Sequence, residues 1–141
     1  MGRGSKKSKR NLKKNSKRKS QRKIPKKKIV IGKIYADWCG HCKILKPEWN
    51  KMKTMIKNNT GRSLKNVEYD IHELGENDYT RENNIEINTL IDDFNKKQFP
   101  NGENRVEYDG FPTVFKIFKK RIDYYNGQKN ADDLYNWATK N

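Results

Sequence analysis

A chain of 141 residues is long enough for one domain with a hydrophobic core and too short for two. The formal net charge of +16 is unevenly spread, because residues 1–28 hold 15 of the 33 Lys and Arg residues and none of the 17 Asp and Glu residues. Residues 29–141 are therefore close to neutral. No run of apolar residues approaches the roughly 20 that span a bilayer, which excludes a transmembrane helix from the predicted elements.

Residues 1–28 form a basic tail. Polar residues separate its charges and apolar residues are nearly absent, so it cannot bury enough surface to offset chain entropy, and we predict disorder. Clustered cations bind nucleic acid and other polyanions by counterion release. Without aromatic residues for base stacking, such binding is expected to ignore base sequence. The candidate nucleic-acid-binding residues are Lys6, Lys7, Arg10, Lys13, Lys14, Arg18, Lys19, Lys26, Lys27 and Lys28.

The charge pattern of the tail is compatible with several functions. Nucleic-acid association, targeting to a nucleus, packaging into a nucleic-acid-containing particle such as a virion, and docking on an anionic membrane all use the same charge pattern. A solubilising extension without a partner is the simplest alternative. The apolar stretch 29–35 contains Lys33 and leads directly into a cysteine motif, so it is predicted to be a strand and not the core of a signal peptide. We therefore expect an unsecreted, intracellular chain.

The first half of the near-neutral region contains two predicted strands and a helix. Residues 29–36 are rich in β-branched side chains and barely alternate, as expected of a strand buried on both faces. Residues 40–58 carry apolar residues at helical spacing, with Pro47 expected to kink the helix. Residues 67–71 are predicted to form a second strand, whereas residues 74–87 are polar and ambiguous.

The second half continues with two helices and a hairpin. Residues 88–99 have one apolar face and are predicted to form a helix capped by their first residue, an asparagine. Residues 113–118 and 121–125 are predicted to form a hairpin, followed by a final helix over 131–139. The order β-α-β-α-β-β-α predicts one α/β domain over residues 29–141, with a central mixed sheet between helices.

The two cysteines, Cys39 and Cys42, lie where the first strand passes into the first helix. Unpaired N–H groups and the helix dipole at such a junction stabilise a thiolate and lower the pKa of the thiol. Cys39 is therefore the expected nucleophile, which forms a mixed disulfide with a substrate. Cys42, one turn later on the same face, is expected to resolve it.

Two other interpretations of the pair are weaker. A structural disulfide closing so short a loop removes little chain entropy. A zinc site requires four ligands, and the only histidines that could complete it are His41, between the cysteines, and His72. Redox chemistry fits better, so neither a metal nor another cofactor is expected.

The neighbouring residues strengthen this interpretation. Residues 36–43, ADWCGHCK, resemble the active-site stretch of thioredoxin-fold proteins of the protein disulfide isomerase type. Pro47 matches their helix-kinking proline, residues 110–113 match their cis-proline loop, and residues 125–133 are similar to their last turn and helix. The resemblance covers residues 29–141. It implies a thioredoxin fold and a thiol–disulfide oxidoreductase that exchanges or isomerises protein disulfides.

The resemblance also implies individual roles. Pro112 is expected to be cis and, with Phe111 and Trp38, to position an extended substrate. His41 beside the nucleophile is expected to favour thiolate and so destabilise the disulfide; the alternative is a solvated side chain with little effect. Isomerase-type and thioredoxin potentials differ by about 90 mV, or about 4 kcal/mol for two electrons. The chain is therefore expected to act as an isomerase or oxidase and not as a strong reductase.

The sequence departs from the family pattern at three places. Lys33 stands six positions before Cys39, where the family usually has a buried acid that moves the proton of the resolving thiol. A charged lysine is no base and is costly to bury. We hypothesise that Cys42 loses its proton by another route, helped by the positive field of Lys33, and that resolution is slow. Lys129 replaces the usual arginine and is a second candidate for tuning the thiol pKa. The insertion at residues 74–104 is either neutral decoration or a partner-selecting element.

A second function stays open at this point: a nucleic-acid-associated or virion-type structural protein with a weakly active fold, which Lys33 favours. For the enzyme, the expected partners are proteins bearing thiols or disulfides and a redox partner that recycles the cysteines. We expect a monomer.

The tail predicts binding to unrelated DNA duplexes, measured by fluorescence anisotropy on the full chain. The affinity should fall steeply as salt rises, because counterion release drives the binding, and it should vanish when residues 1–28 are removed. Binding that survives the truncation would place the nucleic-acid site elsewhere.

Overall fold

Strand β3 (Lys27–Ala36) is the buried strand around which the protein is built. In the computed structural model, which describes residues 27–59 and 66–140, alternate β3 residues enter two separate hydrophobic cores. Ile31 belongs to one core and Val30 to the other. The predicted burial of this strand on both faces is therefore confirmed.

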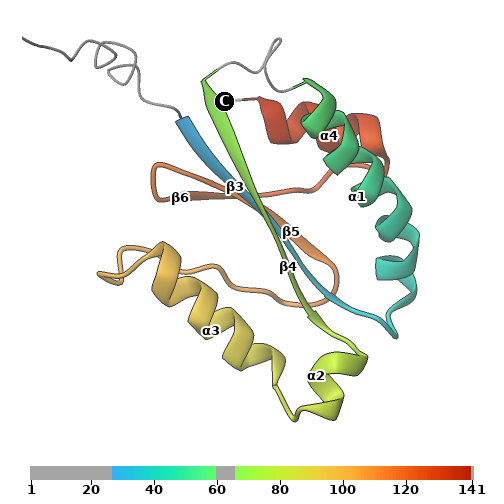
Figure 1. Ribbon diagram of the computed structural model, residues 1–141, viewed down its shortest axis with the longest axis vertical. Coiled ribbons are helices and arrows are strands. Elements are labelled where there is room, and N and C mark those ends of the chain that lie inside the picture. Colours follow the sequence, from blue (N-terminus) through green and yellow to red (C-terminus); the bar gives the residue numbers. More distant parts are fainter. Residues whose placement is uncertain (1–26, 60–65, 141) are drawn as a thin grey trace, which may run out of the picture.

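The sheet has the strand order β4-β3-β5-β6. β3 pairs in parallel with β4 (Val67–Glu76) and antiparallel with β5 (Thr113–Phe118). β6 (Arg121–Tyr124) pairs antiparallel with β5 as the other strand of the predicted hairpin. Helices cover both faces of this sheet, so the predicted mixed α/β architecture is confirmed (Figure 1).

Helices α1 (Gly40–Asn59) and α4 (Ala131–Thr139) lie side by side on one face (Figure 1). α1 continues through Pro47, and α4 begins after Asn130, whose side chain accepts a hydrogen bond from the backbone N–H of Asp133. The apolar residues of α1 recur at helical spacing and fill the core beneath it. The buried members of this core are Ile29, Ile31, Leu45, Trp49, Met52, Ile56, Val114, Leu134 and Ala138.

The opposite face is covered by α3 (Ile87–Gln98), and a short helix, α2 (Asp78–Glu82), precedes it. Ile91 and Phe94 are the buried apolar residues of α3. They join a second core whose other buried members are Val30, Ile34, Phe99, Val106, Phe115 and Ile117. Part of the 74–104 segment is thus a helix that contributes to the core. That this segment is an insertion relative to the family stays a prediction.

The predicted Asn88 cap is wrong. α3 begins one residue earlier, and its N-cap, Glu86, makes no side-chain cap hydrogen bond. The Asn88 side chain instead accepts a hydrogen bond from the Tyr108 hydroxyl at 3.0 Å. A distant loop therefore engages a side chain that the local sequence assigned to the helix end.

Two elements extend beyond or fall outside the predicted ones. β4 continues past residue 71 to Glu76, because it pairs along the whole of β3, to the register pair Ala36 and Glu76. α2 occupies the ambiguous polar segment. α2 begins with a capping box, in which the side chains of Asn77 and Thr80 each accept a hydrogen bond from the backbone N–H of the other residue.

The start of the domain also needs correction. β3 begins at Lys27, so Lys27 and Lys28, which were assigned to the disordered tail, lie in the sheet. The Lys28 ammonium is 3.9 Å from the Asp70 carboxylate on β4. The other candidate residues of the tail lie outside the described residues. Within the described part of the chain, no helix is long and apolar enough to cross a membrane.

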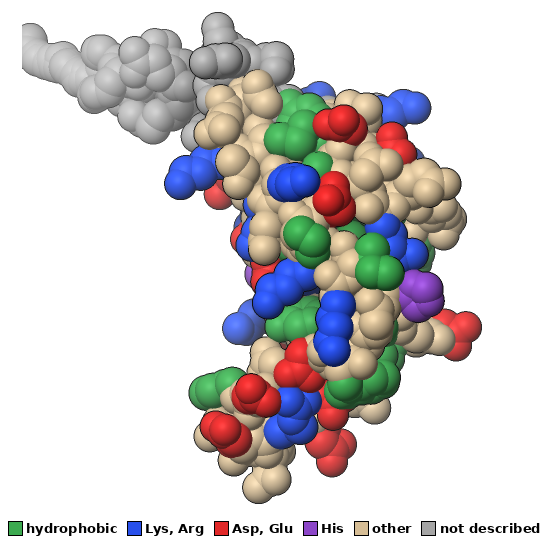
Figure 2. Space-filling view, turned by 90° about the vertical axis from the view of Figure 1, so that its right-hand side faces the viewer, with side chains coloured by type: hydrophobic (Ala, Val, Ile, Leu, Met, Phe, Trp, Pro, Cys, Tyr) green, Lys and Arg blue, Asp and Glu red, His purple; other side chains and the backbone are tan. Residues whose placement is uncertain are grey.

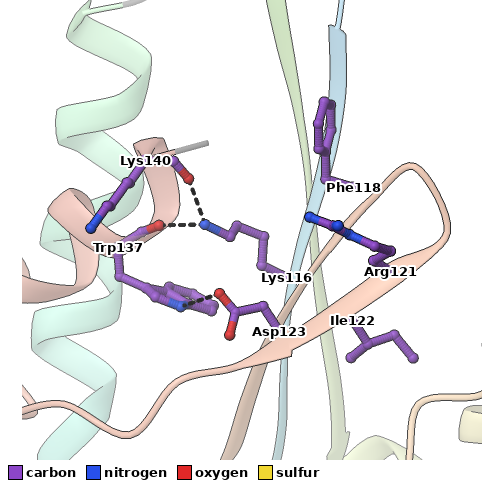
Figure 3. Close-up of a pocket in the computed structure, with 7 residues that line it drawn as sticks. All are labelled: Lys116, Phe118, Arg121, Ile122, Asp123, Trp137 and Lys140. Atoms are coloured by element: carbon purple, nitrogen blue, oxygen red, sulfur yellow. Dashed lines mark hydrogen bonds between the residues drawn. The ribbon is translucent and has the colours of Figure 1, made fainter.

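Lys116 of β5 is a buried cation with a structural role. Its ammonium donates to the backbone carbonyls of Trp137 at 2.6 Å and Lys140 at 2.7 Å, at the end of α4 (Figure 3). These are carbonyls without helical partners, and a cation there also complements the helix dipole. The Trp137 indole donates in turn to Asp123 of β6 at 3.2 Å. The hairpin and α4 are tied together by these bonds.

Candidate active site

Cys39 occupies the N-cap position of α1. Its carbonyl accepts the first helical hydrogen bond, from the N–H of Lys43 at 3.1 Å, and its sulfur accepts the N–H of Cys42 at 3.3 Å. In an ordinary N-cap, a Ser or Asp oxygen fills the place of this sulfur. The start of the helix thus offers an N–H donor to any negative charge on Cys39.

The surroundings of Cys39 favour its thiolate. Burial raises the pKa of the Cys39 thiol, but hydrogen bonds from the thiol and the backbone of Cys42 outweigh it. The backbone N–H of His41 and the charge of Lys129 act in the same direction, so the pKa lies below its ordinary value. The Cys39 thiol also lies 3.6 Å from the carbonyl of Phe111, to which it donates when protonated.

Cys42 is shifted in the opposite direction. Burial and its hydrogen bond to Cys39 raise the pKa of the Cys42 thiol to about 11. At neutral pH, Cys42 is therefore a protonated thiol that donates to the more acidic sulfur of Cys39. Two thiols whose environments drive their pKa values apart can take different roles, one as nucleophile and one as resolving group.

The loop before β5 closes over Cys39. The Phe111–Pro112 peptide bond is cis, as the family resemblance implied. Trp38 is 60% exposed, and its ring meets the Phe111 ring edge-on at 5.7 Å. Phe111 stacks at 5.4 Å on Tyr108. The three residues expected to position a substrate, Trp38, Phe111 and Pro112, are thus gathered beside the nucleophile.

A small pocket adjoins this loop. It has a volume of about 260 Å³, and its lining includes His41, Lys129, Phe111 and Pro112. Two of the three residues that sequence reasoning assigned to tuning the thiols, His41 and Lys129, therefore line one pocket, and Lys33 is not among its lining residues. The catalytic and substrate-positioning roles of these residues stay predictions, which the experiments below address.

Sequence reasoning missed the contacts that fix the loop before Cys39. Arg81 of α2 donates two hydrogen bonds to the Asp37 carboxylate, both at 2.9 Å, and another to Asp78. The Arg81 hydrogen bond lowers the pKa of Asp37. Trp38 donates to Glu76 at 3.1 Å. No local signal identifies these pairs, because Arg81 lies 44 residues from Asp37 in the polar segment that was ambiguous.

Lys33 lies on the face of the sheet covered by α1 and is only 5% exposed. Its register partner on β4 is Glu73, a carboxylate that sequence reasoning did not single out. Burial lowers the pKa of Lys33, while the Glu73 charge raises it in part. The acid missing from position 33 thus has a counterpart on the neighbouring strand.

The candidate zinc ligands do not come together. His72 bonds Asp70 at 3.0 Å and meets the ring of Phe94 on α3, on the face of the sheet opposite α1. Among residues 27–59 and 66–140, no three His, Cys, Asp or Glu side chains are arranged to hold a metal ion. The cysteine pair faces the cis-proline loop instead.

Comparison with known proteins places these features in context. The family model described as Thioredoxin matches residues 11–90, which include both cysteines. Protein disulfide isomerase-like 1-1 of Arabidopsis thaliana is 29% identical over 120 residues, covering 83% of this chain and 19% of that protein. Protein disulfide-isomerase A6 of Mus musculus is 33% identical over 101 residues, covering 71% of this chain and 21% of that protein. The chain spans about a fifth of the length of these relatives.

A solved structure was also compared with the chain. The first thioredoxin domain of mouse protein disulfide-isomerase A4 is 19% identical and has a TM-score of 0.46. The match covers 78% of this chain and 60% of that one.

The opposite pKa shifts predict selective alkylation. With limiting iodoacetamide at pH 7, Cys39 of the reduced protein should react about tenfold or more faster than Cys42, because thiolates react and thiols do not. Peptide mass spectrometry across pH 5–11 measures both rates. Lys129→Met should move the Cys39 profile to higher pH, whereas the exposed control Lys96→Met should leave it unchanged. Equal rates for the two cysteines would contradict the assignment.

Proposed function

Because the chain belongs to the thioredoxin family, we propose that it exchanges disulfides with protein substrates through Cys39 and Cys42. The observation that carries the proposal is the Cys39 sulfur at the start of α1, hydrogen-bonded by the N–H of Cys42 and favoured as thiolate. The loop with the cis Phe111–Pro112 bond lies beside this sulfur, and we propose that an extended substrate docks against it.

The reaction takes two displacements. The Cys39 thiolate attacks a substrate disulfide, so that a Cys39–substrate bond forms, the substrate bond breaks and one substrate thiolate leaves. Cys42 then loses its proton and attacks the Cys39 sulfur. A Cys39–Cys42 disulfide forms and the second substrate thiolate leaves. The same steps in reverse oxidise a substrate dithiol, and a recycling partner of the dithiol or disulfide class restores the starting state.

The proposed direction is isomerisation or oxidation of protein thiols. Lys129 and His41 line the pocket beside Cys39, and the Lys129 charge stabilises the Cys39 thiolate of the reduced pair. Stabilising the reduced form makes the disulfide a stronger oxidant.

The tail is proposed as a separate targeting element for nucleic acid or another polyanion. The face covered by α1 and α4 carries charges of both signs interspersed, without a broad area of one sign (Figure 2). By residue count, nearly all of the excess positive charge belongs to residues 1–28. The chain enters the sheet at Lys27, at the end of β3 opposite the cysteines (Figure 1).

Insulin reduction and refolding of scrambled ribonuclease test the proposed function on the full chain. The wild type should catalyse ribonuclease refolding, and its insulin-reducing activity should be lower than that of a thioredoxin. Cys39→Ser should abolish both, because it removes the nucleophile. Cys42→Ser should retain substrates as mixed disulfides, seen on non-reducing gels. Wild-type activity no greater than that of Cys39→Ser would reject the enzyme in favour of a binding protein.

A further inference from the structure

A second hollow, which we call the tyrosine groove, adjoins the cis-proline loop. It has a volume of about 580 Å³. Its lining includes three tyrosines and two carboxylates, which are Tyr108, Tyr124, Tyr125, Glu107 and Asp109. The tyrosine groove shares Pro112 and Val114 with the smaller pocket described above. The two hollows therefore meet at the cis proline.

Stacked rings connect the tyrosine groove to the nucleophile. The Tyr108 ring stacks on the Phe111 ring, with the ring centres 5.4 Å apart. The backbone carbonyl of Phe111 lies 3.6 Å from the Cys39 sulfur. A substrate segment whose cysteine reacts with Cys39 and which crosses Pro112 therefore brings a nearby side chain to the groove.

Residues 106–109 form one wall of the groove and are neither helix nor strand, yet side chains from two elements hold them in place. Asn95 of α3 is only 5% exposed; it donates to the Val106 carbonyl at 3.0 Å and accepts the Val106 N–H at 2.7 Å. The hydroxyl of Tyr124 on β6 accepts the N–H of Glu107 at 3.0 Å. The groove is thus formed before a substrate arrives, which reduces the entropy lost on binding.

The two carboxylates of the groove have no bound cation in the described part of the chain. Neither Glu107 nor Asp109 forms a side-chain hydrogen bond or an ion pair within 4.0 Å there, and no Lys or Arg lines the groove. Arg105 donates to Asp92 of α3 instead, and this bond, more than the charge of Glu107, raises the pKa of Arg105. The groove therefore presents two negative charges to a ligand.

Tyrosine rings combined with carboxylates suit the side chain of a lysine or an arginine. Its ammonium or guanidinium is attracted both by carboxylates and by the faces of aromatic rings, and its apolar stem packs on those rings. An acidic side chain would be repelled, and an apolar one would leave the carboxylates unpaired. A metal ion fits less well, because within residues 27–59 and 66–140 no three His, Cys, Asp or Glu side chains are arranged to hold one.

We propose that the tyrosine groove binds a lysine or arginine side chain of the protein substrate, close in sequence to the cysteine that reacts with Cys39. Glu107 and Asp109 are the residues that determine this specificity. The proposal rests on the proposed function and narrows its substrate class to proteins with basic residues beside their reactive thiols or disulfides.

The two hollows that meet at Pro112 carry opposite charges. Lys129 lines the smaller pocket, whereas Glu107 and Asp109 line the tyrosine groove. A basic side chain of a bound segment is therefore favoured in the groove and disfavoured in the pocket. This difference sets the direction in which a segment with one basic residue crosses the proline.

Peptides of defined charge test this preference on the full, reduced chain. Each peptide carries its single cysteine as a mixed disulfide with thionitrobenzoate, and has lysine, glutamine or glutamate two residues before and after that cysteine. The Cys39 thiolate attacks the peptide sulfur, the Cys39–peptide bond forms, the bond to thionitrobenzoate breaks, and thionitrobenzoate leaves as a coloured thiolate. Absorbance at neutral pH gives one rate constant for each peptide.

The quantity compared is the ratio of the lysine-peptide to the glutamine-peptide rate constant in each variant, because the basic tail repels a cationic peptide in all of them. Glu107→Gln with Asp109→Asn should lower this ratio about threefold, since two exposed ion pairs are lost. The effect should disappear at about 1 M salt, which screens exposed charges. The glutamate peptide should show no such fall.

A matched control removes the same charge elsewhere. Glu68→Gln with Asp93→Asn changes exposed residues of β4 and α3, and should keep the wild-type ratio. A wild-type ratio in the groove variant, or an equal fall in the control, would overturn the proposal. A glutamine peptide that reacts no faster with the wild type than with Cys39→Ser would reject the proposed function instead.

Discussion

The candidate active site is organised around one hydrogen bond, from the N–H of Cys42 to the sulfur of Cys39 at the start of α1. It exists because Cys39 is the N-cap of the helix, where the backbone turns from β3 and the first N–H groups have no helical partners. A negative sulfur satisfies such a donor better than a neutral one. The same geometry leaves Cys42 buried and protonated, so the two thiols are unequal before any substrate arrives.

The surrounding fold keeps this junction in place from three directions. β3 anchors the loop from the sheet, and the Asp37–Arg81 pair ties it to α2. The cis-proline loop approaches from β5 and brings the Phe111 carbonyl to the Cys39 sulfur. A nucleophile fixed in this way loses little entropy when it attacks.

The two buried lysines, Lys33 and Lys116, have different surroundings. Lys116 donates to two backbone carbonyls and joins the hairpin to α4. The Lys33 ammonium lies over the rings of Tyr35 and Trp49, and its register partner on β4 is Glu73. Burial lowers the pKa of both lysines.

Much of the fold and the site follows from local sequence. The β-branched run of β3, the helical spacing of α1 and the cysteine pair at their junction are local patterns, and the resemblance around residues 110–113 added the cis proline. The partners of these residues are not local. Glu73 faces Lys33 through strand register, and Arg81 reaches Asp37 through tertiary packing. The Asn88 cap was wrong because a distant tyrosine engages the same side chain.

The reduction potential of the Cys39–Cys42 pair tests the central claim, that the helix start stabilises the Cys39 thiolate, most directly. It can be measured by equilibration with glutathione buffers and alkylation of the reduced fraction. A stabilised thiolate favours the dithiol, so the account predicts a potential nearer the isomerase value of about −180 mV than the thioredoxin value of about −270 mV. A potential at or below about −270 mV would contradict it.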